Sequence, residues 1–125
     1  MLAKGVLLDI DGVLHVGDDV VDGAPETLEL LQANDFSLRL LTNTTTEPSS
    51  AILARLGFMG FRIRPEELIT APVAAIRFLR QRRAKSCYFV LKAELKQEFS
   101  EFESSESDPD YIIMGDVPSL LGLES

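Results

Sequence analysis

An apolar run that ends in two aspartates constrains the fold of this chain more than any other feature. Val6, Leu7 and Leu8 show no polar alternation, and Asp9 and Asp11 follow them with one residue between the two carboxylates. A short apolar run without alternation is typical of a strand that is buried on both faces, as in a parallel sheet. The sequence therefore predicts a buried strand whose carboxyl end presents two carboxylates.

Two carboxylates at one strand end need a positive partner. If the strand continues past Asp9, the side chains of Asp9 and Asp11 share a face, because residues two apart do so in a strand. At about 4 Å and an effective dielectric constant of about 20, two such charges repel each other by about 4 kcal/mol. Mg²⁺ prefers oxygen ligands and is the expected cation. Gly12 follows at once and leaves room for a substrate to approach the backbone.

A second strand with a connecting helix completes a βαβ unit. Pro25 opens a helix that is predicted to run to about Ala33, and the apolar stretch 36–41 predicts the next strand. The crossover between two such strands is right-handed, and the strands are parallel. Thr42 and Asn43 follow the second strand, at the edge where open α/β sheets bind their ligands.

The segment after the second strand has the features of a phosphate site. Thr42 and Asn43 offer a hydroxyl and an amide, and the N–H groups of Thr44 and Thr45 are predicted to enter a helix N-terminus, which favours an anion. A simpler interpretation is also open, in which Asn43 forms a turn and the threonines cap the helix. The two aspartates upstream favour the phosphate site.

Carboxylates, cation and phosphate site together indicate phosphoryl transfer through an aspartyl-phosphate. Asp9 lies nearer the strand end and is the expected nucleophile. Asp11 is the expected general acid, which protonates the leaving oxygen and then activates water. The simpler interpretation of both residues is that they are surface carboxylates at a strand–loop junction, and the flanking apolar run and Gly12 argue against it.

The remaining chain alternates helical and strand patterns. Predicted elements are a hairpin or turn over 15–23, a helix that stops at Gly57, a short turn over 65–69, a helix over 72–83, a strand over 86–91, a short helix over 92–99, a solvated loop over 101–110 and a strand over 111–114.

Composition limits the classes of partner and compartment. Twelve basic and twenty acidic residues give a formal net charge of −8, which argues against nucleic-acid binding. The single cysteine, Cys87, lies in an apolar run, so a buried thiol and a cytoplasmic location are expected. The sequence shows neither a transmembrane run nor a signal-peptide pattern, so no membrane partner is expected.

The motifs resemble those of haloacid dehalogenase (HAD) superfamily phosphatases, subfamily IIA. Residues 9–14 are similar to the first motif of that family, residues 40–43 to the second, and residues 15–23 to the flap after the first motif. Within the subfamily, the chain is similar to the haloacid dehalogenase-like hydrolase domain-containing and phospholysine phosphohistidine inorganic pyrophosphate phosphatases. The resemblance covers essentially all 125 residues.

The resemblance implies an α/β fold, with a Rossmann-like core that holds a parallel sheet over 1–84 and the start of an inserted type-2 α/β cap over 85–125. It implies Mg²⁺ bound by Asp9 and by Asp11, the latter through its backbone carbonyl. A small phosphorylated molecule is the implied substrate, with Gly12, Thr42, Asn43 and Thr44 around its phosphate. Dimerisation is an expectation from the family alone.

Two motifs of the family are expected beyond residue 125, a lysine and a Gly-Asp-Asp strand end. The chain is therefore expected to be truncated and to have weak or no activity by itself. Asp116 imitates the second of these motifs, but the resemblance assigns its strand to the cap. Lys85, Lys92 and Lys96 are expected to be surface residues.

Other functional classes remain open. A non-catalytic regulatory or interaction protein derived from the same fold is the main alternative, because of the expected truncation. A receiver-like phospho-acceptor domain is disfavoured, since its acceptor aspartate lies on a later strand. A calcium loop is excluded because Gly12 comes too early after Asp11. His15 is expected to pack in the flap rather than to act in catalysis.

Overall fold

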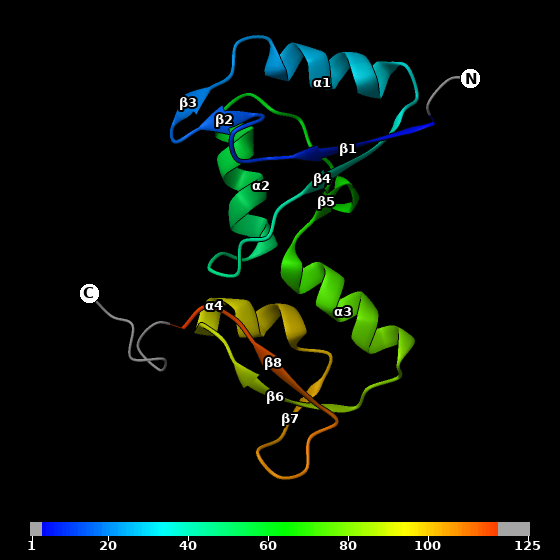
Figure 1. Ribbon diagram of the computed structural model, residues 1–125, viewed down its shortest axis with the longest axis vertical. Coiled ribbons are helices and arrows are strands. Elements are labelled where there is room, and N and C mark those ends of the chain that lie inside the picture. The colour runs from blue at the N-terminus through cyan, green and yellow to red at the C-terminus, as the bar shows by residue number, and fades with distance from the viewer. Residues whose placement is uncertain (1–3, 118–125) are drawn as a thin grey trace. The chain divides into compact units, whose positions relative to one another are not determined.

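The computed structural model describes residues 4–117, which form two compact units (Figure 1). The first unit contains residues 4–43 and 49–70, and the second contains residues 44–48 and 71–117. The helix α3 (Ala71–Gln81) belongs to the second unit. The boundary that the sequence predicts, between residues 84 and 85, therefore lies inside this unit and follows α3.

A three-stranded parallel sheet forms the centre of the first unit. Its strands are β1 (Gly5–Asp9), β4 (Ser37–Leu41) and β5 (Leu68–Ile69), in the order β1-β4-β5. The ladders are parallel in both pairs, with Asp9 opposite Leu41. This arrangement confirms the predicted βαβ unit and the α/β fold class.

The helices α1 (Ala24–Ala33) and α2 (Ser49–Phe58) pack on the same face of this sheet. Strand order advances in one direction from β1 through β4 to β5, so two right-handed crossovers place both helices on one side. Leu28 of α1 and Leu56 of α2 are buried in a single core with Leu40 of β4. The other members of that buried core are Ile10, Leu14, Leu38, Ile52, Phe61 and Leu68.

The prediction that β1 is buried on both faces is wrong for the described residues. Burial alternates along the strand: Val6 and Leu8 pack against the core, whereas Leu7 is 69% exposed. The reason is topological, because both connecting helices of the described chain lie on the face of Val6 and Leu8. Leu7 is apolar, as is typical of a residue in a parallel strand, but its side chain is not buried within this unit.

Several element boundaries differ from the prediction. The flap forms the expected hairpin, with β2 (His15–Val16) antiparallel to β3 (Asp19–Val20). The predicted turn over 65–69 is instead the 3₁₀ helix η1 (Pro65–Glu67) followed by β5. Helix α2 continues one residue past the expected stop at Gly57, and Gly60 adopts the positive φ of 99° that suits glycine.

The second unit is built on another parallel sheet, in the order β7-β6-β8. Its strands are β6 (Ser86–Val90), β7 (Glu103–Ser104) and β8 (Tyr111–Met114), and its helices are α3, α4 (Ala93–Lys96) and the 3₁₀ helix η2 (Gln97–Phe99). Strand β7 lies in the segment predicted to be a loop. Strand β8 has the predicted bounds.

Cys87 is buried in the core of the second unit, as expected. Burial and, after it, the charge of Asp110 raise the pKa of the Cys87 thiol above its ordinary value. A buried thiol with a raised pKa is a poor nucleophile. Cys87 therefore contributes to the packing of the second unit within the described residues.

The basic residues near the end of α3 make contacts within the second unit. The Arg80 guanidinium donates to the Glu101 carboxylate, with Nη2 2.6 Å from Oε1, and hydrogen bonds from Arg80 hold the pKa of Glu101 below its usual value. The Arg82 guanidinium lies 5.0 Å from the centre of the Phe78 ring. Arg80 and Arg82 thus both have partners within the second unit.

Candidate functional site

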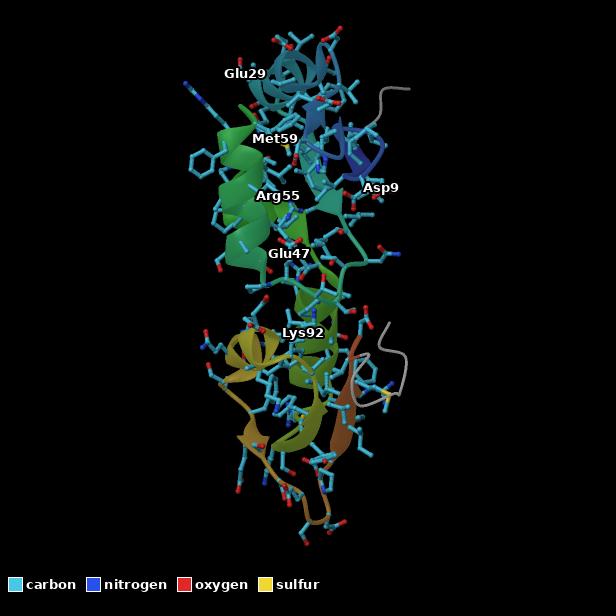
Figure 2. The ribbon with its side chains drawn as sticks, turned by 90° about the vertical axis from the view of Figure 1, so that its left-hand side faces the viewer. Asp9, Glu29, Glu47, Arg55, Met59 and Lys92 are labelled. Atoms are coloured by element: carbon cyan, nitrogen blue, oxygen red, sulfur yellow. The ribbon has the colours of Figure 1, made fainter. Side chains whose placement is uncertain are left out.

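The two predicted motifs end at the same edge of the first sheet. Asp9 is the last residue of β1 and Leu41 is the last residue of β4, and the two are partners in the parallel ladder. Thr42 and Asn43 therefore leave the sheet beside the point where Asp9 and Asp11 leave it. Figure 2 labels Asp9 at the end of the blue strand β1.

Ile10 fixes the geometry between the two aspartates. Its side chain is buried in the core of the first unit, whereas Asp9 and Asp11 are exposed. The Ile10 N–H donates to Oδ1 of Asp9 at 2.8 Å, and the Ile10 carbonyl accepts from Leu14 N–H at 2.9 Å. One buried anchor thus holds both carboxylates on the solvent side of the strand end.

Gly12 allows the chain to turn directly after Asp11. Its φ is 81°, which lies in the left-handed region, and its N–H donates to the carbonyl of His15 at 2.8 Å. An added Cβ would meet no atom within 4 Å. The need for glycine therefore comes from the backbone conformation, and not from a lack of space at this position within the described residues.

His15 lies beside Asp11, which the sequence did not predict. Its side chain is buried, its Nδ1 is 2.9 Å from the Gly17 carbonyl, and its Nε2 is 3.7 Å from Oδ1 of Asp11. An isolated backbone bridge also joins Asp11 to His15. The flap thus returns directly to the second aspartate.

The phosphate cradle predicted at a helix N-terminus is wrong in one respect. Helix α2 begins at Ser49, so the N–H groups of Thr44 and Thr45 do not enter its first turn. Pro48 gives the reason, since the residue before a proline is driven away from the helical region and the helix starts only after it. Thr42 stays at the sheet edge, where its N–H donates to the Ile69 carbonyl at 3.1 Å.

Thr44 belongs to the second unit, whereas Asp9, Asp11, Thr42 and Asn43 belong to the first. Its hydroxyl lies 3.1 Å from that of Thr46. The site that the structure brings together within one unit therefore consists of the two aspartates, Gly12 with the turn after it, and the two residues after β4. Those residues are Asp9, Asp11, Gly12, Thr42 and Asn43.

A buried carboxylate supports the strand beside this edge. Glu67, which precedes β5, is 1% exposed and accepts from the Arg64 N–H at 2.9 Å and from Gln32 of α1 at 3.2 Å. Burial raises the pKa of Glu67, but hydrogen bonds from the backbone and side chain of Arg64 and from Gln32 outweigh it and leave that pKa below its usual value. Glu67 was not predicted as a functional residue. Its only signal in the sequence is a charge three positions after Arg64, at a turn that begins with proline.

Asp116 and the three lysines discussed in the sequence analysis all lie in the second unit. Asp116 follows β8 in the second unit, and its N–H donates to the Thr45 hydroxyl at 3.1 Å. Lys85, Lys92 and Lys96 are exposed residues of the same unit, and Figure 2 labels Lys92. The predicted surface positions of these lysines are confirmed.

The donor set fits Mg²⁺. Within residues 4–117, no group of three or more acidic, histidine or cysteine side chains is arranged to hold a metal ion. Mg²⁺ does not need such a group, because it commonly keeps several waters and binds one or two carboxylates together with substrate phosphates. The exposed carboxylate of Asp9 and the backbone carbonyl of Asp11, on either side of the buried Ile10, would meet that smaller requirement.

A match to a family model identifies the family of this chain. The model of the haloacid dehalogenase-like hydrolase family matches residues 6–104, which include the whole of the site described above. The chain belongs to the haloacid dehalogenase-like hydrolase family. The resemblance drawn from residues 9–14 and 40–43 is thereby confirmed.

Individual relatives agree with this family. Haloacid dehalogenase-like hydrolase domain-containing protein 2 of Mus musculus is 34% identical over 92% of this chain and 43% of its own length. Chronophin of Rattus norvegicus is 45% identical over 74% of this chain and 32% of its own length. The solved structure of NagD from Escherichia coli has a TM-score of 0.85 at 30% identity, over 95% of this chain and 48% of that one.

The chain spans less than half the length of each of these hydrolase relatives. The family match covers residues 6–104, which include parts of both units and the edge at which Asp9 and Thr42 lie. None of the helices within residues 4–117 has the length and apolarity that a membrane crossing requires.

Proposed function

We propose that this chain supplies the nucleophile and the acid–base group of a Mg²⁺-dependent phosphatase that acts on a small phosphorylated molecule. The observation that supports the proposal most is the register of β1 and β4, which sets Asp9 beside Thr42 at one sheet edge in a hydrolase family. Similar proteins include the ribonucleotide monophosphatase NagD and an acid sugar phosphatase of Staphylococcus haemolyticus.

In the proposed reaction, a carboxylate oxygen of Asp9 attacks phosphorus in line with the leaving oxygen. The P–O bond to the leaving group breaks as the bond to Asp9 forms, and Asp11 gives its hydrogen to the leaving oxygen. Asp11 then takes a hydrogen from water, which attacks the aspartyl-phosphate and releases phosphate. Thr42 and Asn43 orient the phosphoryl group through a hydroxyl and an amide.

Mg²⁺, when bound by Asp9 and by the backbone carbonyl of Asp11, would neutralise the charge that otherwise keeps a phosphate from approaching a carboxylate. The remaining ligands would be waters and the phosphate itself. Thr44, which follows Asn43 directly in the sequence, is kept as a proposed phosphate-binding residue.

The test combines turnover with chemical trapping. Hydrolysis of para-nitrophenyl phosphate is measured with Mg²⁺, for this chain and for any longer form of the protein that contains it. Reaction mixtures are quenched with borohydride, which reduces an aspartyl-phosphate to homoserine, and the modified residue is found by peptide mass spectrometry. We expect homoserine at position 9 in the wild type and none in Asp9→Asn.

A matched variant is Asp18→Asn, which removes an exposed carboxylate from the flap and should leave turnover unchanged. Turnover that survives Asp9→Asn would overturn the nucleophile assignment. A longer form that is inert on a broad panel of phosphate esters would favour the alternative function, a regulatory or interaction protein built on the same fold.

A further inference from the structure

Basic residues are concentrated at the end of α3 in an otherwise acidic chain. The formal net charge is −8, yet five of the twelve lysines and arginines fall within residues 77–85, a stretch without an acidic residue. A helix dipole favours cations in the last turn of a helix, whereas three of these five come after α3 has ended at Gln81. The five residues are Arg77, Arg80, Arg82, Arg83 and Lys85.

The three basic residues that follow α3 line an open cavity of the second unit. The cavity has a volume of about 490 Å³ and lies where the end of α3 meets the starts of β6 and β8 (Figure 1). The pairing of the two strands sets this geometry, because the Asp110 N–H donates to the Ser86 carbonyl at 3.0 Å. The cavity is lined by Arg82, Arg83, Ala84, Lys85, Asp110 and Tyr111.

Asp110, the acidic residue among those that line the cavity, is bound to the backbone. Its Oδ2 accepts from the N–H of Lys85 at 2.8 Å and from the N–H of Ser86 at 3.3 Å. These two hydrogen bonds, assisted by the charge of Lys85, outweigh burial and hold the pKa of Asp110 below its usual value. Asp110 therefore fixes the turn into β6, and three cations outnumber its single negative charge at the cavity.

The cations of the cavity have no carboxylate partner at ion-pair distance among residues 4–117. Arg80 is paired with Glu101, but it does not line the cavity. Neither Arg83 nor Lys85 forms an ion pair in that range, although an acidic segment lies beside them, since the Glu103 N–H donates to the Lys85 carbonyl at 2.9 Å. Unpaired cations around a cavity favour an anionic ligand from outside the unit.

The backbone at Arg83 is a second, independent observation. Its φ is 54°, in the left-handed region. The Arg83 N–H donates to the Arg80 carbonyl and the Ala84 N–H to the Leu79 carbonyl, both at 3.0 Å, which is the pattern of a helix end that usually has glycine at this position. An arginine there strains the backbone, and no ion pair of its side chain within the described residues offsets that cost.

We propose that this cavity binds a small ligand with two or more phosphate groups, held by Arg82, Arg83 and Lys85. The guanidinium groups present paired N–H donors that match phosphate oxygens, and the lysine ammonium adds a point charge on a flexible chain. The Arg82 guanidinium lies 5.0 Å from the centre of the Phe78 ring, a contact that holds it at the mouth of the cavity.

A compact ligand fits this surface better than a nucleic acid does. The segment that joins β7 to β8 borders the cations and contains Glu106 and Asp108, and Glu103 precedes it in β7. These charges would repel an extended chain of phosphates. The site consists of residues of the second unit, whereas Asp9 and Thr42 belong to the first, so the inference does not rest on the proposed function.

Calorimetric titration with sodium tripolyphosphate tests the site. Mg²⁺ is replaced by EDTA, so that phosphate bound through a metal ion at Asp9 does not contribute to the heat. We expect Arg83→Gly and Lys85→Gln each to weaken binding at least about fivefold. Arg77→Gln is the matched control, because it removes an exposed cation of α3 that does not line the cavity, and it should weaken binding less than about twofold.

Arg83→Gly also separates binding from folding. Glycine suits the left-handed backbone at this position, so the thermal midpoint of the variant should be at or above that of the wild type. A loss of binding in this variant therefore cannot come from unfolding. Equal losses in Arg77→Gln and Arg83→Gly would mean diffuse attraction to a basic helix and would overturn the proposal, as would undiminished binding by Arg83→Gly.

Amide NMR spectra and two competing ligands complete the test. We expect tripolyphosphate to shift the resonances of residues 82–86 and 110–111, whereas shifts confined to residues 9–12 and 42–43 would place the anion at the candidate catalytic site and overturn the inference. Citrate that binds more tightly than tripolyphosphate would overturn the phosphate class. A single-stranded RNA that binds more tightly, and is lost in Arg83→Gly, would make the cavity part of a nucleic-acid site instead.

Discussion

Asp9 and Leu41 are the last partners of the parallel ladder between β1 and β4. This pairing makes the two strands end level, so the loop that holds Asp11 and the loop that holds Thr42 start from the same edge. A site for phosphate chemistry needs a carboxylate and neutral donors within one small volume, and neither loop alone contains both. The register of one strand pair thus brings the candidate site residues of the two loops to one edge of the sheet.

Mg²⁺ binding should distinguish the two aspartates. In the proposed site Asp9 binds the ion through its carboxylate, whereas Asp11 uses its backbone carbonyl, which a side-chain change leaves in place. We therefore expect Asp9→Asn to weaken Mg²⁺ binding at least about tenfold and Asp11→Asn to weaken it less than about threefold. Isothermal titration calorimetry with MgCl₂ alone checks this. Equal losses in the two variants would mean that both carboxylates coordinate the ion.

Gly12 and Gly57 form a matched pair for substitution by alanine. Neither has an atom within 4 Å of an added Cβ, but Gly12 has a φ of 81° and Gly57 lies in helix α2. Gly12→Ala should lower the free energy of unfolding by about 1 kcal/mol, because an L side chain strains that conformation. Gly57→Ala should raise it by about 0.5–1 kcal/mol. Urea denaturation followed by circular dichroism measures both, and a neutral Gly12→Ala would refute the conformational argument.

The elements predicted correctly are those in which local chemistry and periodicity agree. The strand end at Asp9, the helix after Pro25 and the strand over 111–114 combine an apolar run with a residue that stops it, and the structure has all of them. The short strand β5 was not predicted, because two residues are too few to show a periodic pattern. It forms because Leu68 pairs with Leu40 across the sheet.

Other features depend on contacts that no local pattern contains. Thr44 was expected at a helix N-terminus because hydroxyls commonly cap helices, but Pro48 delays the start of α2. The approach of His15 to Asp11 follows from the return of a hairpin, and the role of Glu67 follows from Gln32 on another helix. The start of α2 is thus a local effect of Pro48, whereas the contacts of His15 and Glu67 depend on a hairpin and on a distant helix.

Leu7 and Leu38 show how topology decides which apolar residues stabilise the described unit. Leu7 is 69% exposed on the face that neither helix covers, whereas Leu38 of the adjacent strand is buried between the sheet and the helices. We expect Leu38→Ala to lower the free energy of unfolding of this chain by about 2–5 kcal/mol and Leu7→Ala by less than about 0.5 kcal/mol. A cost at Leu7 as large as that at Leu38, in the same denaturation experiment, would show that the face of Leu7 is covered in solution.

Glu67 should make the stability of the first unit depend on pH. Its pKa is lowered in the folded state, so its contribution is complete above the ordinary glutamate pKa of about 4.3 and is lost as the pH falls through the lower folded value. Glu67→Gln keeps the shape but accepts the Arg64 and Gln32 hydrogen bonds less well. At pH 7 we expect it to lower the free energy of unfolding by about 1–3 kcal/mol.

The difference between wild type and Glu67→Gln should shrink as the pH is lowered below about 4, because the protonated carboxyl then resembles the amide. Glu66→Gln is the matched control, since Glu66 is the exposed neighbour of Glu67 and lies 3.8 Å from the same Arg64 side chain. Its effect should stay within about 0.5 kcal/mol at both pH values. Urea denaturation of the three proteins across this range decides the matter: a gap between Glu67→Gln and wild type that is constant with pH would mean that packing of the side chain, and not its charge, holds β5 beside the site.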